Sequence, residues 1–172
     1  MPSAAVPVPL AAAVMLAVAA LSLPAVSDLV MAQPAEPTAE QPALPKERLV
    51  IVTRDGKQHD FNVEMALSQQ QQEVGEMFRK SVPADEGMLF VWQFPQNSEM
   101  WMKNTLVPLD MVFINADGKI RAIAEETTPQ SLADISSRGP VKATLELAGG
   151  TTAKLGIRVG DTVKQRIFNN AS

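Results

Sequence analysis

Short runs of β-branched and apolar residues, broken at brief intervals by turn signals, limit most strongly what this chain can fold into. The strand-like runs include RLVIVT, GMLFVW, LDMVFI and VKATLEL. Asp55-Gly56 and Asp117-Gly118 mark tight turns, because these residues tolerate the backbone angles that hairpins require. Short strands with frequent turns favour a small antiparallel barrel or sandwich. We therefore predict a mainly β (α+β) domain of about eight short strands with about two short helices.

Two segments change to a helical pattern. Ser68 and Gln71 match the capping box that begins a helix, so we predict a short helix from about Gln69 to near Gly75. A second short helix is expected over residues 151–156, after a pair of glycines and with a threonine as its cap. We also predict a strand in EMWMKNT, residues 99–105, and a long irregular loop over residues 127–140.

The N-terminal residues differ in composition from the rest. Residues 1–27 carry no charged side chain and contain the apolar run Leu10–Leu23. This run is shorter than the about 20 residues of a membrane-spanning helix, and it fits the core of a secretory signal. We predict a signal peptide over residues 1–32, with a retained N-terminal anchor as the alternative. The proline-rich residues 33–46 are predicted to be a disordered linker, followed by a folded domain over residues 47–169.

Composition excludes several classes of site. The chain has no cysteine, one histidine and a formal net charge of −4. Disulfides, thiolate metal sites and multi-histidine metal centres are therefore excluded. The charge gives no indication of a nucleic-acid partner. We predict no metal, no cofactor, a periplasmic or secreted location, and no membrane attachment after removal of the signal; the sequence specifies no oligomeric state.

Five motifs occur in an order that resembles the DUF192 family of small bacterial and archaeal proteins. They are VGEMFRK, DEGMLFVW, WMKNTLVPLDMVFINADGKI, LELAGG and GIRVGD, and the resemblance as a whole covers about residues 63–163. The resemblance implies a compact, β-rich, barrel-like fold and often an exported location. The family is one of unknown function, so the resemblance implies no activity, substrate or catalytic residue. Glu76 is a departure, since the family resemblance leads us to expect Gly-Leu-Met where this chain has Gly-Glu-Met.

The stretch WMKNTLVPLD, residues 101–110, contains the strongest candidate site. An indole, an ammonium group, an amide, a hydroxyl and a carboxylate occur close together there, a mixture that suits a sugar or a small anionic ligand. We predict a ligand pocket that also has an arginine and a glutamate nearby. Its residues are Trp101, Lys103, Asn104, Thr105, Asp110, Arg79 and Glu86.

Each of these residues also has a structural alternative. Asn104 and Thr105 could hydrogen-bond the backbone of a turn, and Asp110 could cap a loop or pair with Lys103. Arg79 could clamp an anionic group or form an ion pair with a nearby acid, Asp85 or Glu86. The many methionines suit core packing better than a Cu(I) site.

These observations favour a non-catalytic module that binds a small polar ligand, with carbohydrate as one class that fits. One alternative is a hydrolase that uses Asp110 with Lys103. Another is a domain for protein interaction or metal handling in the cell envelope. The sequence favours a role other than that of an enzyme.

Overall fold

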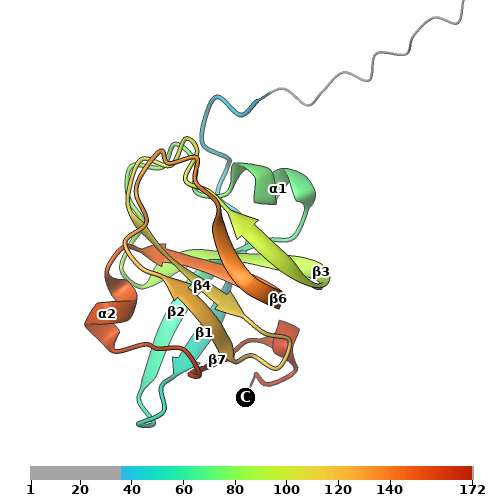
Figure 1. Cartoon of the computed structure of the whole chain (residues 1–172), viewed down its shortest axis with the longest axis vertical. Helices are drawn as coiled ribbons and strands as arrows, with labels where there is room; N and C mark the ends of the chain where they lie inside the picture. Colours follow the sequence, from blue (N-terminus) through green and yellow to red (C-terminus); the bar gives the residue numbers. More distant parts are fainter. Residues whose placement is uncertain (1–35, 172) are drawn as a thin grey trace, which may run out of the picture. The chain divides into compact units, whose positions relative to one another are not determined.

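The computed structural model describes residues 36–171, which form one strongly curved β-sheet with two short α-helices (Figure 1). In chain order the elements are β1 (Lys46–Val52), β2 (Gln58–Ala66), α1 (Gln69–Val74), β3 (Glu86–Met100), β4 (Leu109–Ile114), β5 (Ile120–Ala124), β6 (Ile135–Ala148), α2 (Thr151–Leu155), β7 (Thr162–Lys164) and the 3-10 helix η1 (Arg166–Phe168). The predicted signal peptide and the first residues of the predicted linker lie outside the described residues.

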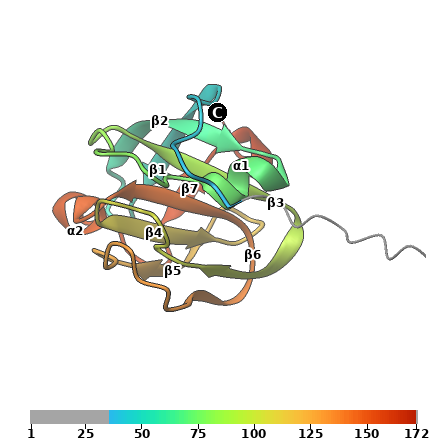
Figure 2. The same ribbon diagram turned by 90° about the horizontal axis from the view of Figure 1, so that it is seen from above.

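The strands follow the order β5-β4-β6-β3-β2-β1-β7, and the sheet curls until its two outer strands approach each other (Figure 2). A single bridge between Lys119 and Thr162 joins these outer strands, and nearby backbone hydrogen bonds of 2.7 to 2.9 Å support it. Neighbouring strands are antiparallel except β2 and β3, which are parallel because the chain crosses over through α1. The predicted mainly β, barrel-like fold is thus confirmed, with seven strands in the sheet.

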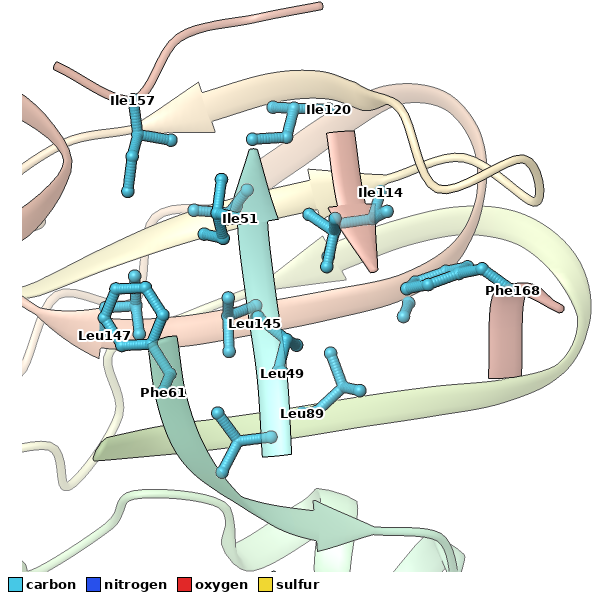
Figure 3. Close-up of a cluster of buried hydrophobic side chains, with 14 of the residues drawn as sticks. Leu49, Ile51, Phe61, Leu89, Ile114, Ile120, Leu145, Leu147, Ile157 and Phe168 are labelled. Atoms are coloured by element: carbon cyan, nitrogen blue, oxygen red, sulfur yellow. The ribbon is translucent and has the colours of Figure 1, made fainter. Parts of the chain in front are cut away.

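The inner face of the sheet forms the main core (Figure 3). Alternate residues of each strand point to the same face, so the residues at every second position in β1 to β6 meet inside the barrel. Two core residues come from outside the strands: Ile157, which follows α2, and Phe168, which ends η1. Its other buried members are Leu49, Ile51, Phe61, Val63, Met65, Leu89, Val112, Ile114, Ile120, Ala143, Leu145, Leu147 and Val163.

The outer face of the same sheet carries a second buried layer. Two smaller apolar clusters lie there, and they are richer in methionine and aromatic side chains than the inner core. They are covered by α1, by the loop from residue 101 to 108 and by the described part of the predicted linker. The buried members of these clusters are Ala66, Met88, Phe90, Met102, Leu109, Met111, Phe113 and Val141.

The first helix follows the prediction closely, while the second is capped differently. Helix α1 begins after Ser68, which forms the predicted capping box with Gln71, and Gly75 follows its last residue. The second helix, α2, is preceded by Gly150 in the left-handed conformation and has no side-chain cap from its own threonines.

Two local predictions are wrong. Residues 99–105 are not a separate strand, because β3 continues through two register shifts to Met100 and the chain then turns at residues 101–105. The predicted loop over residues 127–140 ends early, because β6 begins at Ile135. The strand accommodates Arg138 and Gly139 at positive φ, beside an irregularity in the β3–β6 pairing.

Residues 36–45 belong to the predicted linker, and we call them the N-terminal strap. The strap contains no helix or strand, yet it contacts the outer layer. Gln41 Nε2 donates to the carbonyl oxygens of Gln71 and Gly75 at 3.1 and 3.0 Å. Leu44 packs against the cluster that contains Met88 and Phe90. In residues 36–171 no helix has the length and apolar character that a membrane span needs.

Candidate functional site

Asp110 faces the inside of the barrel. It pairs with Leu147 across the β4–β6 ladder, and Leu147 belongs to the inner core. Its fully buried carboxylate accepts hydrogen bonds from the backbone N–H groups of Glu126, Gly150 and Thr152 and from the Thr152 hydroxyl, at 2.7 to 2.9 Å. Asp110 therefore anchors the start of α2, the capping role that the sequence left open as an alternative.

Trp101 and Lys103 lie at the surface. The Lys103 ammonium is 5.1 Å from the centroid of the Trp101 ring, and it forms an ion pair of 2.6 Å with Glu36 of the strap. Trp101 is 47% exposed, so its indole ring presents a free edge to solvent. These two side chains form a cation–π pair that helps to hold the strap.

Asn104 and Thr105 form the turn between β3 and β4. Asn104 has a φ of 56°, and its carbonyl oxygen accepts a hydrogen bond of 2.8 Å from the Phe78 N–H. Thr105 is buried, and its carbonyl oxygen accepts from the Gln130 N–H at 3.1 Å. The structure thus does not bring the predicted pocket residues together around one hollow, since Asp110 lies on the opposite face from this turn.

Arg79 and Glu86 each have an acidic or basic partner. Glu86 pairs with Lys46 at 2.6 Å. Arg79 donates from both terminal nitrogens to the Glu64 carboxylate, at 2.8 Å each, and its Nε lies 3.3 Å from a Glu76 oxygen. The sequence suggested an ion pair for Arg79 but named Asp85 or Glu86 as partners, because the parallel β2–β3 pairing that brings Glu64 close was not predicted.

Glu64, Glu76, Arg79 and Glu146 form what we call the acid cluster. Glu64, Met88, Glu146 and Met111 are direct neighbours across β2, β3, β6 and β4, so they share the outer face. The three glutamates are 2 to 4% exposed. Glu146 therefore sits between two methionines, whose thioethers solvate a carboxylate poorly.

Burial is the largest single influence on the pKa of each glutamate in this cluster. It raises the pKa of Glu76 to about 7, and the charges of Glu64 and Glu86 act in the same direction against the opposing effect of Arg79. Burial also raises the pKa of Glu146 well above its usual value. For Glu64, burial acts to raise the pKa, but hydrogen bonds from Arg79 and the Leu44 N–H outweigh it and lower the pKa. Perturbed acids of this kind mark candidate functional sites.

The geometry of the acid cluster differs from that of a carboxylate metal site. Within residues 36–171, no group of at least three histidine, cysteine, aspartate or glutamate residues has an arrangement that could hold a metal ion. The cluster has one cation, Arg79, for three acids. The number of its acids that are protonated can therefore change with pH.

A groove of about 720 Å³ opens over β5 and the start of β6, and we call it the arginine groove. Its lining combines apolar side chains with a polar wall of two arginines, two serines and one aspartate. Its lining residues are Phe113, Arg121, Ala122, Ile123, Ala124, Asp134, Ile135, Ser136, Ser137, Arg138 and Val159.

Close backbone packing fixes the arginine wall. Arg121 donates from Nε and Nη2 to the Arg138 carbonyl oxygen, at 3.3 and 2.8 Å. A Cβ atom at Gly139 would lie 2.0 Å from Arg121 Nη2, so glycine is needed for this approach. The buried Ser137 hydroxyl donates to the Gly139 carbonyl oxygen at 2.7 Å and accepts from the Ser98 N–H at 2.9 Å. These contacts hold the Arg121 guanidinium and the backbone at Arg138 and Gly139 in place.

Arg121 and Arg138 have no acidic partner among residues 36–171. By contrast, Arg48, Arg54, Arg79 and Arg166 each pair with a carboxylate, and Arg158, which also has no acidic partner among these residues, does not line the groove. Sequence reasoning missed this groove. The segment SSRGP was the available signal, since arginine followed by glycine and proline interrupts an otherwise regular strand.

The fold and much of the sequence are shared with two solved structures. One, from Sinorhizobium meliloti 1021, is described as a putative transcription regulator; it is 43% identical, with a TM-score of 0.72, and the match covers 74% of this chain and 98% of that chain. The other is a protein of unknown function from Novosphingobium aromaticivorans DSM 12444; it is 34% identical, with a TM-score of 0.69, and the match covers 74% of this chain and 91% of that chain.

Comparison with curated proteins found no match. The family model DUF192, described as "Uncharacterized ACR", matches residues 50–165. This match spans well over half of the chain and agrees with the motifs, the barrel and both solved structures. The chain therefore belongs to the DUF192 family.

Proposed function

We propose that this domain is a non-catalytic module that binds a small anionic ligand in the arginine groove. The observation that supports it is the pair Arg121 and Arg138, which face one groove without an acidic partner among the described residues. Guanidinium groups bind carboxylates and phosphates through paired hydrogen bonds, and they remain charged at any physiological pH.

The shape of the groove fits a ligand of modest size. Ligand sites typically enclose about 300 to 1,000 Å³, and an apolar floor with a few fixed polar groups is their usual composition. Here Ile123 and Ile135 are among the apolar lining residues, and Asp134 and Ser136 can hydrogen-bond hydroxyl groups. A carboxylated or phosphorylated sugar matches this mixture, which keeps carbohydrate within the proposed ligand class.

A non-catalytic role is supported by the placement of the residues that a hydrolase would need. The Asp110 carboxylate already accepts four hydrogen bonds, and it lies on the inner face of the sheet. Lys103 is held at the surface by Glu36 and Trp101. Neither group is available to the other as an acid–base partner.

Isothermal titration calorimetry tests the proposal with inorganic phosphate, glucuronate and glucose 6-phosphate, and with glucose as the uncharged control. We expect the charged probes to bind and glucose to bind much more weakly. The double variant R121A/R138A should raise the Kd for the charged probes at least about tenfold, a loss of about 1.4 kcal/mol.

Lys154→Ala is the matched control, because it removes an α2 cation that is exposed and lies outside the groove. Its Kd values should equal those of the wild type. Equal binding of glucose and glucose 6-phosphate, or an unchanged Kd in the double variant, would refute an anion site in this groove.

We also propose that the domain acts in the periplasm or outside the cell. The support is the uncharged N-terminal region with its apolar run, which fits a secretory signal. Cell fractionation with N-terminal sequencing of the recovered protein tests it. A mature chain that begins near Gln33 agrees with the proposal, and an uncleaved cytoplasmic chain contradicts it.

A further inference from the structure

The acid cluster lies where the N-terminal strap and the turn after α1 meet the outer face of the sheet. Glu64 Oε2 accepts a hydrogen bond of 2.8 Å from the Leu44 N–H, so a cluster member holds the strap directly. Gln41 binds the last turn of α1 at Gln71 and Gly75, next to Glu76 in the chain. The strap, the turn and the cluster therefore form one connected set of contacts.

The cluster has more acids than its cation can neutralise. The Arg79 guanidinium is bidentate on Glu64, and only its Nε approaches Glu76, at 3.3 Å. Both Glu76 carboxyl oxygens are buried without a hydrogen-bond partner. Such an orphaned group is rare in folded proteins, and it is far less costly when the carboxyl is protonated.

Charged groups from every packed element act on Glu76. Arg79 lies in the same turn, Glu64 comes from β2 and Glu86 from the start of β3. Lys46 comes from β1, and Glu146 of β6 interacts with Glu76. Glu40 of the strap acts on Arg79. The acids outnumber the two cations, so an ionised Glu76 is surrounded by net negative charge.

We propose that the acid cluster is a proton-operated latch for the N-terminal strap. When Glu76 releases its proton to solvent, its carboxylate competes with Glu64 for the Arg79 guanidinium. Glu64 is then no longer fixed in the position from which it accepts the Leu44 N–H. The strap detaches from the outer face, and the turn after α1 loosens with it.

The latch operates near neutrality. The pKa of Glu76 is raised to about 7, so its carboxyl is neutral in mildly acidic solution and ionised in mildly alkaline solution. The strap is therefore closed at lower pH and released at higher pH. Burial also raises the pKa of Glu146, so this neighbour favours the neutral form as well.

Amide hydrogen exchange of the full chain tests the latch, with rates corrected for their intrinsic pH dependence. In the wild type we expect the protection of the Leu44 amide to fall at least about tenfold when pH rises from about 6 to about 8. Glu76→Gln should abolish this pH dependence, because the amide cannot ionise. Glu73→Gln is the matched control, since it removes an exposed acid from α1 and should leave the wild-type response intact.

Carboxyl-carbon NMR of the wild type gives a second measurement that needs no variant. The Glu76 carboxyl and the Leu44 amide should titrate with the same midpoint, near neutral pH. The latch is refuted if the two midpoints differ, if wild-type protection is independent of pH, or if Glu76→Gln keeps the wild-type response.

Discussion

The inner and outer faces of this sheet differ in what their side chains are able to do. Leu145 and Glu146 are adjacent in β6, yet the first lies in the apolar core and the second in the acid cluster. Apart from Met65 and the capping carboxylate of Asp110, the inner face is filled by aliphatic and aromatic side chains whose contribution is packing. The outer face is equally buried in places, but it contains acids, methionines and an arginine under a thin cover of strap, helix and loop.

This difference means that the inner face sets the stability of the fold, while the outer face makes that stability depend on pH. When a side chain in a close-packed apolar core is shortened, the free energy of unfolding falls by the same amount at every pH. A buried acid cluster changes its free energy with protonation, while its volume stays the same. We therefore expect variants of the inner face to be uniformly destabilised and variants of the outer face to depend on conditions.

The largest expected effect comes from Asp110, a buried carboxylate on the inner side. Asp110→Ala leaves four donors without their acceptor: the Thr152 hydroxyl, the backbone N–H groups of Gly150 and Thr152 at the start of α2, and the Glu126 N–H after β5. With about 1 to 3 kcal/mol for each orphaned buried group, unfolding free energy should fall by about 4 kcal/mol or more. Urea denaturation measures this loss. Asp110→Asn, which keeps one acceptor oxygen, should lose less, and equal losses would argue against the capping role.

Leu145→Ala should lower the free energy of unfolding by about 3 kcal/mol, since it leaves a cavity in the inner core. The loss should be the same in mildly acidic and mildly alkaline buffer. Its neighbour Glu146→Gln provides the contrast, because that variant should respond to pH. If Leu145→Ala showed the stronger pH dependence, the division between the two faces would be wrong.

Glu76→Gln should stabilise the protein by about 2 kcal/mol in mildly alkaline buffer, and hardly at all in acid. The pKa of Glu76 is raised from 4.5 to about 7, so the folded state binds the proton more tightly. The stability that this proton provides is complete below pH 4.5 and is lost as pH rises toward 7. Urea denaturation of both proteins across this window measures the difference, and parallel pH profiles would contradict it.

The smallest effect is expected at the surface of the outer side. Trp101 is 47% exposed and forms a cation–π pair with the Lys103 ammonium, so Trp101→Ala should change unfolding free energy by about 0.5 kcal/mol or less. Thermal denaturation measures it. A loss comparable to that of Leu145→Ala would mean that this indole has a packing role that its exposure does not reveal.

The sequence predicted the inner face well because that face follows simple periodic rules. Phe61, Val63 and Met65 alternate with polar residues in β2, and all three lie in the inner core. The capping box of α1 depends on residues only three apart, so local reasoning located that helix correctly. Such local patterns were enough for the mainly β, barrel-like class.

The outer face was predicted poorly because long-range pairing builds it. Glu64 and Glu146 are far apart in sequence, and the parallel β2–β3 pair and the β3–β6 ladder bring them to opposite sides of Met88. The stretch from Trp101 to Asp110 looked like one site because its residues are close in sequence. A turn followed by a strand places Asp110 inside the barrel and Lys103 outside it. Local spacing contains no information about which face a residue after a turn will occupy.

The β-bridge between Lys119 and Thr162 affects how this protein can bind other proteins. Outer strands with free N–H and C=O groups can be extended by a strand from another chain, which is one common route to peptide capture and to aggregation. Here the backbones around Gly118, Ile120 and Asp161 already satisfy one another at that boundary. A peptide strand would find few unpaired backbone N–H and C=O groups to bind at that boundary. Binding of a partner there would therefore depend on the side chains on the surface of the barrel.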